Sequence, residues 1–141
     1  MFSICLAGVR QHEWREKLKT LIDSKLTVCD PYVIEWEDLT SNQNANQLAK
    51  EIEYIHNGCK LVIFYIDSSR EKKSILMEIG ECVAKNKSII LCLDGDVEDK
   101  EDIQQYCEYH GIITTYSFQE FVSTINDYFV QVGKCEPVLV G

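Results

Sequence analysis

The stretch Leu61-Val62-Ile63-Phe64-Tyr65-Ile66 decides the fold, because every side chain in it is apolar or aromatic. A short run without polar positions is typical of a strand buried on both faces, as in the centre of a parallel sheet. The run ends at Asp67-Ser68-Ser69, and a helical pattern that carries Leu76, Ile79 and Val83 follows it. The sequence therefore predicts a central strand that leads directly into a helix.

A strand and a helix are also predicted at the start of the chain. Residues 2–7 form an apolar run that stops at Gly8, which indicates a short buried strand. From Gln11 the apolar residues recur at the period of an amphipathic helix. Four residues form its predicted inward face, and four charged residues lie elsewhere on it: Trp14, Leu18, Leu21 and Ile22 inward, and Glu13, Arg15, Glu16 and Lys19 outside that face.

Two elements are predicted between these segments. Leu26 to Cys29 reads as a second strand, which extends to Ile34 if the chain continues past Pro31. A proline removes a ladder donor, so this strand is expected at a sheet edge. After the polar residues 40–44, apolar spacing predicts a helix that ends at Gly58. Its inward face carries Leu48, Ile52 and Ile55.

The alternation continues to the end of the chain. Four further elements are expected: a strand at 88–93, an exposed helix at 98–110, a strand at 112–116 and a helix from 118 that Gly133 closes. Strands that alternate with helices imply right-handed crossovers and a parallel sheet of about five strands covered on both faces. The fold class is therefore α/β, a three-layer sandwich with a flavodoxin-like strand order. We expect one domain over residues 1–133 and a C-terminal tail, 134–141, that suits a subunit contact.

Composition narrows the class of partner. The 141 residues carry a formal net charge of −9, which disfavours binding to nucleic acid or to an anionic membrane, so we expect a small-molecule ligand. No secretory signal pattern or membrane-length apolar run is present, which favours the cytoplasm. The seven cysteines are scattered without a C-x-x-C pair and are interpreted as buried, reduced thiols. The three histidines share no ligand spacing, so no metal site is expected. No other cofactor is expected either.

Ligands of open α/β sheets bind beyond the carboxyl ends of the strands, where the strand order reverses. The chain leaves the first strand through Gly8-Val9-Arg10 and the central strand through Asp67. The following helix is expected to begin near Ser74, with Glu78 one turn in and Gly80 allowing close approach. Neither G-x-x-x-x-G-K-[ST] nor G-x-G-x-x-G occurs, which disfavours ATP and dinucleotide binding. By itself Glu78 is only a carboxylate near a helix start, a place where solvated acids are common.

Taken together, these segments resemble the nucleoside 2-deoxyribosyltransferases and their relatives, the 2'-deoxynucleoside 5'-phosphate N-hydrolases. The resemblance extends over most of the chain. Its elements are Ile4–Gly8, Trp14, Glu35-Trp36-Glu37-Asp38, Glu51, the strand that ends at Asp67, the stretch from Ser74 through Gly80 to Asn86–Ile90, and Tyr106–Ile112.

The resemblance implies an enzyme that cleaves or exchanges the N-glycosidic bond of a nucleoside or nucleotide. Glu78 then corresponds to the nucleophile that attacks the anomeric carbon, as in retaining glycosidases. Glu51 corresponds best to the carboxylate that handles the proton of the leaving base, and Asp67 is the reserve. The expected substrate contacts are Gly8, Arg10, Trp14, Ser74 and Gly80. Sites of this family are completed by a neighbouring subunit, so a homo-oligomer is expected.

Some positions depart from the family pattern. Cys59-Lys60 replaces an Ala-Asp pair, Ile75 replaces a hydroxyl residue three places before the acid, and Val9 replaces a common serine. These changes leave the base, the phosphate and the acceptor open. Two other functions remain as alternatives: a TIR-like enzyme that cleaves NAD, and a non-catalytic module that binds a nucleotide signal. For single side chains, a core role for Trp14 and an Arg10–Asp67 ion pair also remain open.

Overall fold

A computed structural model describes residues 2–30, 46, 58–68 and 72–135 of the chain. It contains five strands and four helices within these residues. In chain order they are β1 (Phe2–Gly8), α1 (His12–Leu21), β2 (Val28–Cys29), β3 (Cys59–Ile66), α3 (Lys72–Ala84), β4 (Ser88–Leu93), α4 (Lys100–His110), β5 (Ile113–Thr115) and α5 (Phe118–Cys135).

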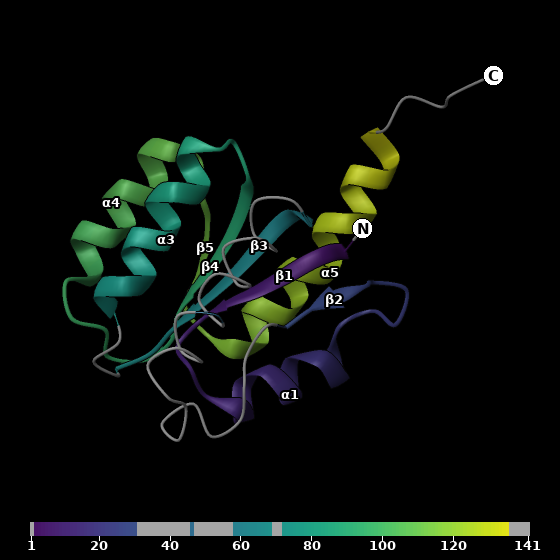
Figure 1. The fold of residues 1–141 in the computed structure, drawn as a ribbon, viewed down its shortest axis with the longest axis horizontal. Coiled ribbons are helices and arrows are strands. Elements are labelled where there is room, and N and C mark those ends of the chain that lie inside the picture. Colours follow the sequence, from purple (N-terminus) through teal and green to yellow (C-terminus); the bar gives the residue numbers. More distant parts are fainter. Residues whose placement is uncertain (1, 31–45, 47–57, 69–71, 136–141) are drawn as a thin grey trace.

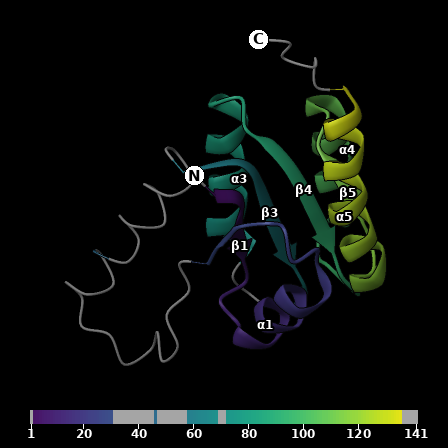
Figure 2. The same cartoon turned by 90° about the vertical axis from the view of Figure 1, so that its right-hand side faces the viewer.

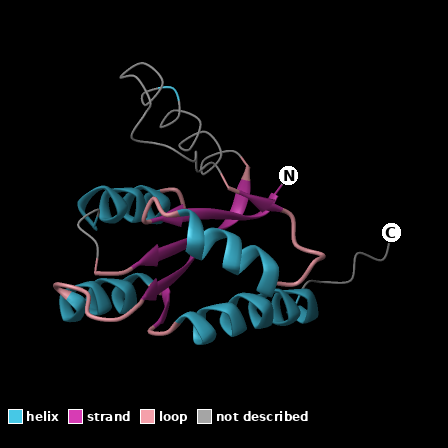
Figure 3. Cartoon of the chain, turned by 90° about the horizontal axis from the view of Figure 1, so that it is seen from below, coloured by secondary structure: helices cyan, strands magenta, loops and turns pink. Residues whose placement is uncertain are grey.

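The described strands form one parallel sheet in the order β2-β1-β3-β4-β5. Helices α3 and α4 cover one face of this sheet, and α1 and α5 cover the other (Figure 1). Figure 3 shows the strands between the helices in a view along the layers. The α/β sandwich, the five parallel strands and the flavodoxin-like order are confirmed.

Strand β3 lies between β1 and β4, as its unbroken apolar sequence predicts. Its pairing is regular along both edges, from Ile4 beside Leu61 to Leu93 beside Ile66. Side chains of a strand alternate between faces, and Tyr65 packs against the rings of α1 and α5. The arrows of β3 and β4 point to the end of the sheet where α1 begins (Figure 2). The carboxyl ends of the strands therefore meet at one edge.

Most element boundaries agree with the sequence prediction within two residues. The edge position of β2 and the end of α4 at Gly111 are confirmed, and Gly111 has a left-handed φ of 68°. The prediction that α5 closes at Gly133 is wrong, since the helix continues to Cys135. A glycine ends a helix where its backbone turns left-handed, as Gly111 does, and otherwise only weakens it. Helix α3 begins at Lys72, two residues before Ser74.

The inward face of α1 differs from the prediction. Arg15, expected outside that face, is only 3% exposed, whereas Leu21, expected inward, is 49% exposed. Trp14, Leu18 and Ile22 are buried as predicted. The buried stripe is rotated toward Arg15 because its guanidinium binds Asp30 and backbone carbonyls at the end of β1.

Several predictions lie outside the described residues: the extension of the second strand to residue 34, the helix carrying Leu48, Ile52 and Ile55, and the tail after Cys135. The six cysteines whose side chains are described are free and buried, in line with the interpretation as reduced thiols. None of the helices within the described ranges has both the length and the apolarity needed to cross a membrane.

Candidate active site

The strand order reverses between β1 and β3, because the chain goes from β1 to β2 on one side and places β3 on the other. In open α/β sheets a ligand crevice lies at this point, beyond the carboxyl ends. Gly8 at the end of β1 pairs with Tyr65, and Arg10 and Asp67 follow the two strands as half-buried residues. The predicted Gly8, Arg10 and Asp67 therefore belong to one edge of the sheet.

Gly8 has a structural reason to be glycine. Its φ is +116°, and an added Cβ would stand 2.3 Å from the carbonyl oxygen of Tyr65. The amide of Val9 donates to that same oxygen at 2.9 Å, so β1 stays joined to β3 through its last residue. Only glycine permits this approach of the two backbones.

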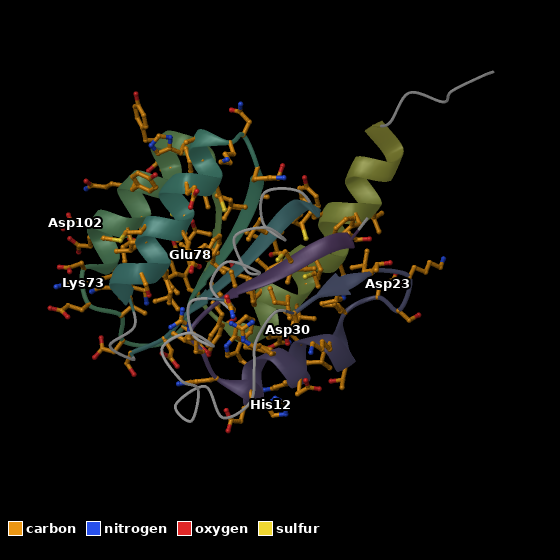
Figure 4. All side chains as sticks on the ribbon, in the orientation of Figure 1. His12, Asp23, Asp30, Lys73, Glu78 and Asp102 are labelled. Carbon is orange, nitrogen blue, oxygen red and sulfur yellow. The ribbon has the colours of Figure 1, made fainter. Side chains whose placement is uncertain are left out.

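Glu78 is half-buried in the second turn of α3, since the helix begins at Lys72. Residues four apart share a helix flank, so Ser74 and Cys82 lie above and below Glu78 on the same side. Burial raises the pKa of the Cys82 thiol to about 12, and the neighbouring Glu78 carboxylate adds to this rise. In Figure 4, Glu78 lies on the side of α3 toward the central strands, and Asp102 of α4 lies at the outer edge.

Gly80 lies on a different side of α3 from Glu78, since residues two apart do not share a helix flank. A Cβ at Gly80 would meet the Tyr106 hydroxyl of α4 at 3.9 Å. A pocket of about 450 Å³ lies between α3 and α4 and is lined by Leu76, Ile79, Asp99, Asp102, Ile103, Tyr106 and Cys107. The structure thus places Gly80 beside Tyr106 of α4, and its role in substrate binding stays a prediction.

A second acidic residue, Asp94, lies at the same edge as Asp67, directly after β4. The Tyr65 hydroxyl donates a hydrogen bond to it. Burial raises the pKa of Tyr65, and the hydrogen bond to Asp94 and the charges of Asp94 and Asp67 raise it further. The hydroxyl is therefore protonated at neutral pH. Beside it lies a shallow pocket of about 230 Å³, whose lining includes Trp14 and Phe118.

Trp14 is 4% exposed and stacks on Tyr65, with ring centroids 5.0 Å apart. Its indole Nε1 donates to the carbonyl of Val9 at 2.8 Å. Trp14 is thus mainly a core residue that also supports the turn after β1, and it contributes to the lining of the 230 Å³ pocket.

The structure therefore brings Gly8, Arg10, Trp14 and Asp67 together where β1 and β3 end, with Ser74 and Glu78 on α3. Glu51 lies outside the described residues. No group of metal-ligating side chains was found within the part of the chain that the structure describes.

Sequence reasoning missed Tyr65 and Asp94, as well as the pair Arg15 and Asp30. The sequence pattern indicates Tyr65 only as part of an apolar strand. A hydroxyl so near the end of one strand can nevertheless reach the residue that follows the neighbouring strand. Arg15 follows Trp14 directly, and Asp30 precedes Pro31 at the end of a strand. A basic residue beside a buried tryptophan was the available signal.

A sequence model of the family described as "Nucleoside 2-deoxyribosyltransferase like" matches residues 2–95, which is two thirds of the 141 residues. The chain belongs to this family. The match extends from β1 to the turn after β4, so the nucleoside 2-deoxyribosyltransferase-like region includes every predicted site residue. No curated protein sequence matches the chain.

Proposed function

We propose that the protein cleaves or exchanges the N-glycosidic bond of a (deoxy)nucleoside or nucleoside 5'-monophosphate. The observation that carries the proposal is the position of Glu78. This half-buried carboxylate lies on α3, which follows the central strand β3, and within the region that matches the nucleoside 2-deoxyribosyltransferase-like family. In the proposal, the Glu78 carboxylate approaches a ligand bound beyond the ends of β1 and β3 from α3.

In the proposed reaction a carboxylate oxygen of Glu78 attacks the anomeric carbon of the sugar. A C–O bond forms, the C–N bond breaks, and the electron pair of that bond goes to the nitrogen of the leaving base. The product of this step is a covalent glycosyl-Glu78 intermediate. Water resolves it in a hydrolase and gives the free sugar, whereas a second base resolves it in a transferase.

The leaving base needs a proton, and the attacking water or base must lose one. We propose Glu51 for this role and Asp67 as the reserve. Asp67 is half-buried at the end of β3, close enough to influence Tyr65 electrostatically.

We also propose that Arg10 and Ser74 contact the sugar or its 5'-phosphate. Arg10 follows Gly8 at the edge of the sheet, and Ser74 lies one helical turn before Glu78 on the same flank. A second copy of the chain that completes the site remains a prediction.

Family membership favours this reaction over cleavage of NAD by a TIR-like enzyme. The sensor alternative retains the crevice but has no need of Glu78. One experiment distinguishes the proposed reaction from both alternatives. The protein is incubated with deoxynucleosides, their 5'-monophosphates and NAD, and the released base is measured by chromatography.

Glu78→Gln tests the assignment, and Glu81→Gln is its matched control on the same helix, because Glu81 is exposed. The proposal expects Glu78→Gln to lower base release about 10³-fold or more, since a nucleophile acts only in the chemical step. Glu81→Gln should behave as wild type. Base release that survives Glu78→Gln contradicts the nucleophile, and tight binding without release by the wild type favours the sensor.

A further inference from the structure

Arg15 is a buried cation that the proposed reaction does not use. It is 3% exposed, and its Nη1 donates to Oδ1 of Asp30 at 2.7 Å. The same guanidinium lies near three backbone carbonyls at the end of β1: those of Leu6 at 3.4 Å, Gly8 at 3.5 Å and Val9 at 3.4 Å. One side chain of α1 thus holds the last residues of β1 and the first residue after β2.

Asp30 is held from both sides. Its Oδ2 lies 2.7 Å from Nζ of Lys19, and its side chain is 9% exposed. In Figure 4, Asp30 lies between α1 and the strands, on the opposite face of the sheet from α3 and Glu78. A buried ion pair adds little net stability compared with apolar side chains of similar size, because removing both charges from water is unfavourable. Its presence at the carboxyl edge therefore suggests a role in fixing geometry.

The geometry that it fixes is the turn at Val9 and Arg10. The Val9 carbonyl accepts from the Trp14 indole at 2.8 Å and from the Gln11 amide at 2.9 Å, besides its contact with Arg15. The bond from Gln11 closes a three-residue γ-turn centred on Arg10. All described donors to this carbonyl therefore come from α1 or its start.

The direction of one amide follows from this arrangement. In a trans peptide the C=O and the following N–H point in opposite directions, and no described peptide bond is cis. The Gly8–Val9 peptide shows this geometry, because its carbonyl points toward Arg15 and its N–H points toward β3. By the same geometry the Arg10 N–H points away from α1, because the Val9 carbonyl of the same peptide points toward it.

We propose that Arg15 and Asp30 are positioning residues that hold the Val9–Arg10 peptide so that its N–H donates to an oxygen of the bound ligand. That oxygen belongs to a sugar hydroxyl or to a 5'-phosphate, which both accept such a bond. The identity of the ligand rests on the proposed function, but the ordering of the turn by Arg15 and Asp30 does not.

The double variant Arg15→Met/Asp30→Leu tests the inference because it removes both charges together and leaves neither buried alone. The fold should then persist, with a melting temperature close to that of the wild type, while the carbonyls of β1 lose their donor. Lys19→Met is the matched control, since it removes only the outer, 33% exposed partner of Asp30. Arg15→Lys provides the same readouts if the double variant does not fold, because one ammonium cannot replace the planar fork.

The first readout is the backbone order of Arg10 in the ligand-free protein, measured by ¹⁵N relaxation. The inference expects the order parameter to fall from about 0.85 to below about 0.6 in the double variant, and to stay high in Lys19→Met. An Arg10 amide that stays equally ordered in a folded double variant overturns the inference. This readout needs no turnover, so it separates failure of the inference from failure of the proposed function.

The second readout is steady-state kinetics with a deoxynucleoside and its 5'-monophosphate. Loss of one hydrogen bond to the ligand should raise KM about tenfold, with a smaller change in kcat. A rise for both substrates indicates a sugar hydroxyl as the acceptor, and a rise for the monophosphate alone indicates the phosphate. An unchanged KM for both overturns the inference, whereas a wild type that releases no base contradicts only the proposed function.

Discussion

The Tyr65 hydroxyl donates a hydrogen bond to Oδ2 of Asp94 and thereby joins the carboxyl ends of β3 and β4. Both residues lie beside the exit of the central strand, where Asp67 follows. Burial, this hydrogen bond and the two nearby carboxylates all raise the pKa of Tyr65. The acidic edge of the sheet is thus built around a phenol that stays protonated.

The first prediction concerns Tyr65→Phe. At pH 7 this change should lower the free energy of unfolding by about 1–2 kcal/mol, because the half-buried Asp94 loses a donor. The pH dependence should change as well. A pKa that is raised on folding contributes stability that is complete below the unfolded value of about 10 and is lost as the pH rises toward the raised value.

The wild type should therefore lose stability above about pH 10 more steeply than Tyr65→Phe, as urea titrations between pH 7 and 11 would measure. Tyr109→Phe is the control, since Tyr109 is 85% exposed. Equal stabilities and equal slopes for the two variants would show that the bond to Asp94 contributes nothing.

The second prediction concerns Gly8. Gly8→Ala should lower the free energy of unfolding by about 3 kcal/mol, because its Cβ would clash with the Tyr65 backbone and its φ is left-handed. Gly95→Ala is the control, with a φ of +76° but no atom within 4 Å of the added Cβ. It should lose only about 1–2 kcal/mol. Similar losses in thermal unfolding would contradict the close approach of β1 to β3.

The third prediction concerns Gly80, which lies inside α3 with an ordinary φ, where an added Cβ would make only an ordinary van der Waals contact with the Tyr106 hydroxyl at 3.9 Å. Gly80→Ala should raise the free energy of unfolding by about 0.5–1 kcal/mol, because alanine restricts the unfolded chain and is the better helix former. Denaturant titration measures the change. A lower stability would mean that the space beside Tyr106 is needed by another group.

The sequence was sufficient to predict the order of the elements, because each buried strand is a continuous apolar run with a turn-forming residue near its end. The parallel sheet and the edge position of β2 followed from that alternation and from Pro31. The predicted end of α5 at Gly133 was wrong because a glycine ends a helix only where its φ angle is left-handed, and the sequence does not reveal this angle.

The site was less predictable than the fold. Glu78 emerged from resemblance to a family, since periodicity alone indicated only an acid near a helix start. Arg15, Asp30, Tyr65 and Asp94 depend on contacts between elements 15 to 29 residues apart in sequence, and local patterns do not contain this information.

The covalent glycosyl-Glu78 intermediate is the central claim, and mass spectrometry tests it most directly. The wild type is mixed with a deoxynucleoside that it cleaves, quenched in acid during turnover and digested. The account predicts a peptide whose added mass equals the nucleoside minus its base, with the modification on Glu78, and the same adduct in Glu81→Gln. The claim would be contradicted if the wild type turned over substrate without any adduct on Glu78 and the Glu78→Gln variant kept that turnover.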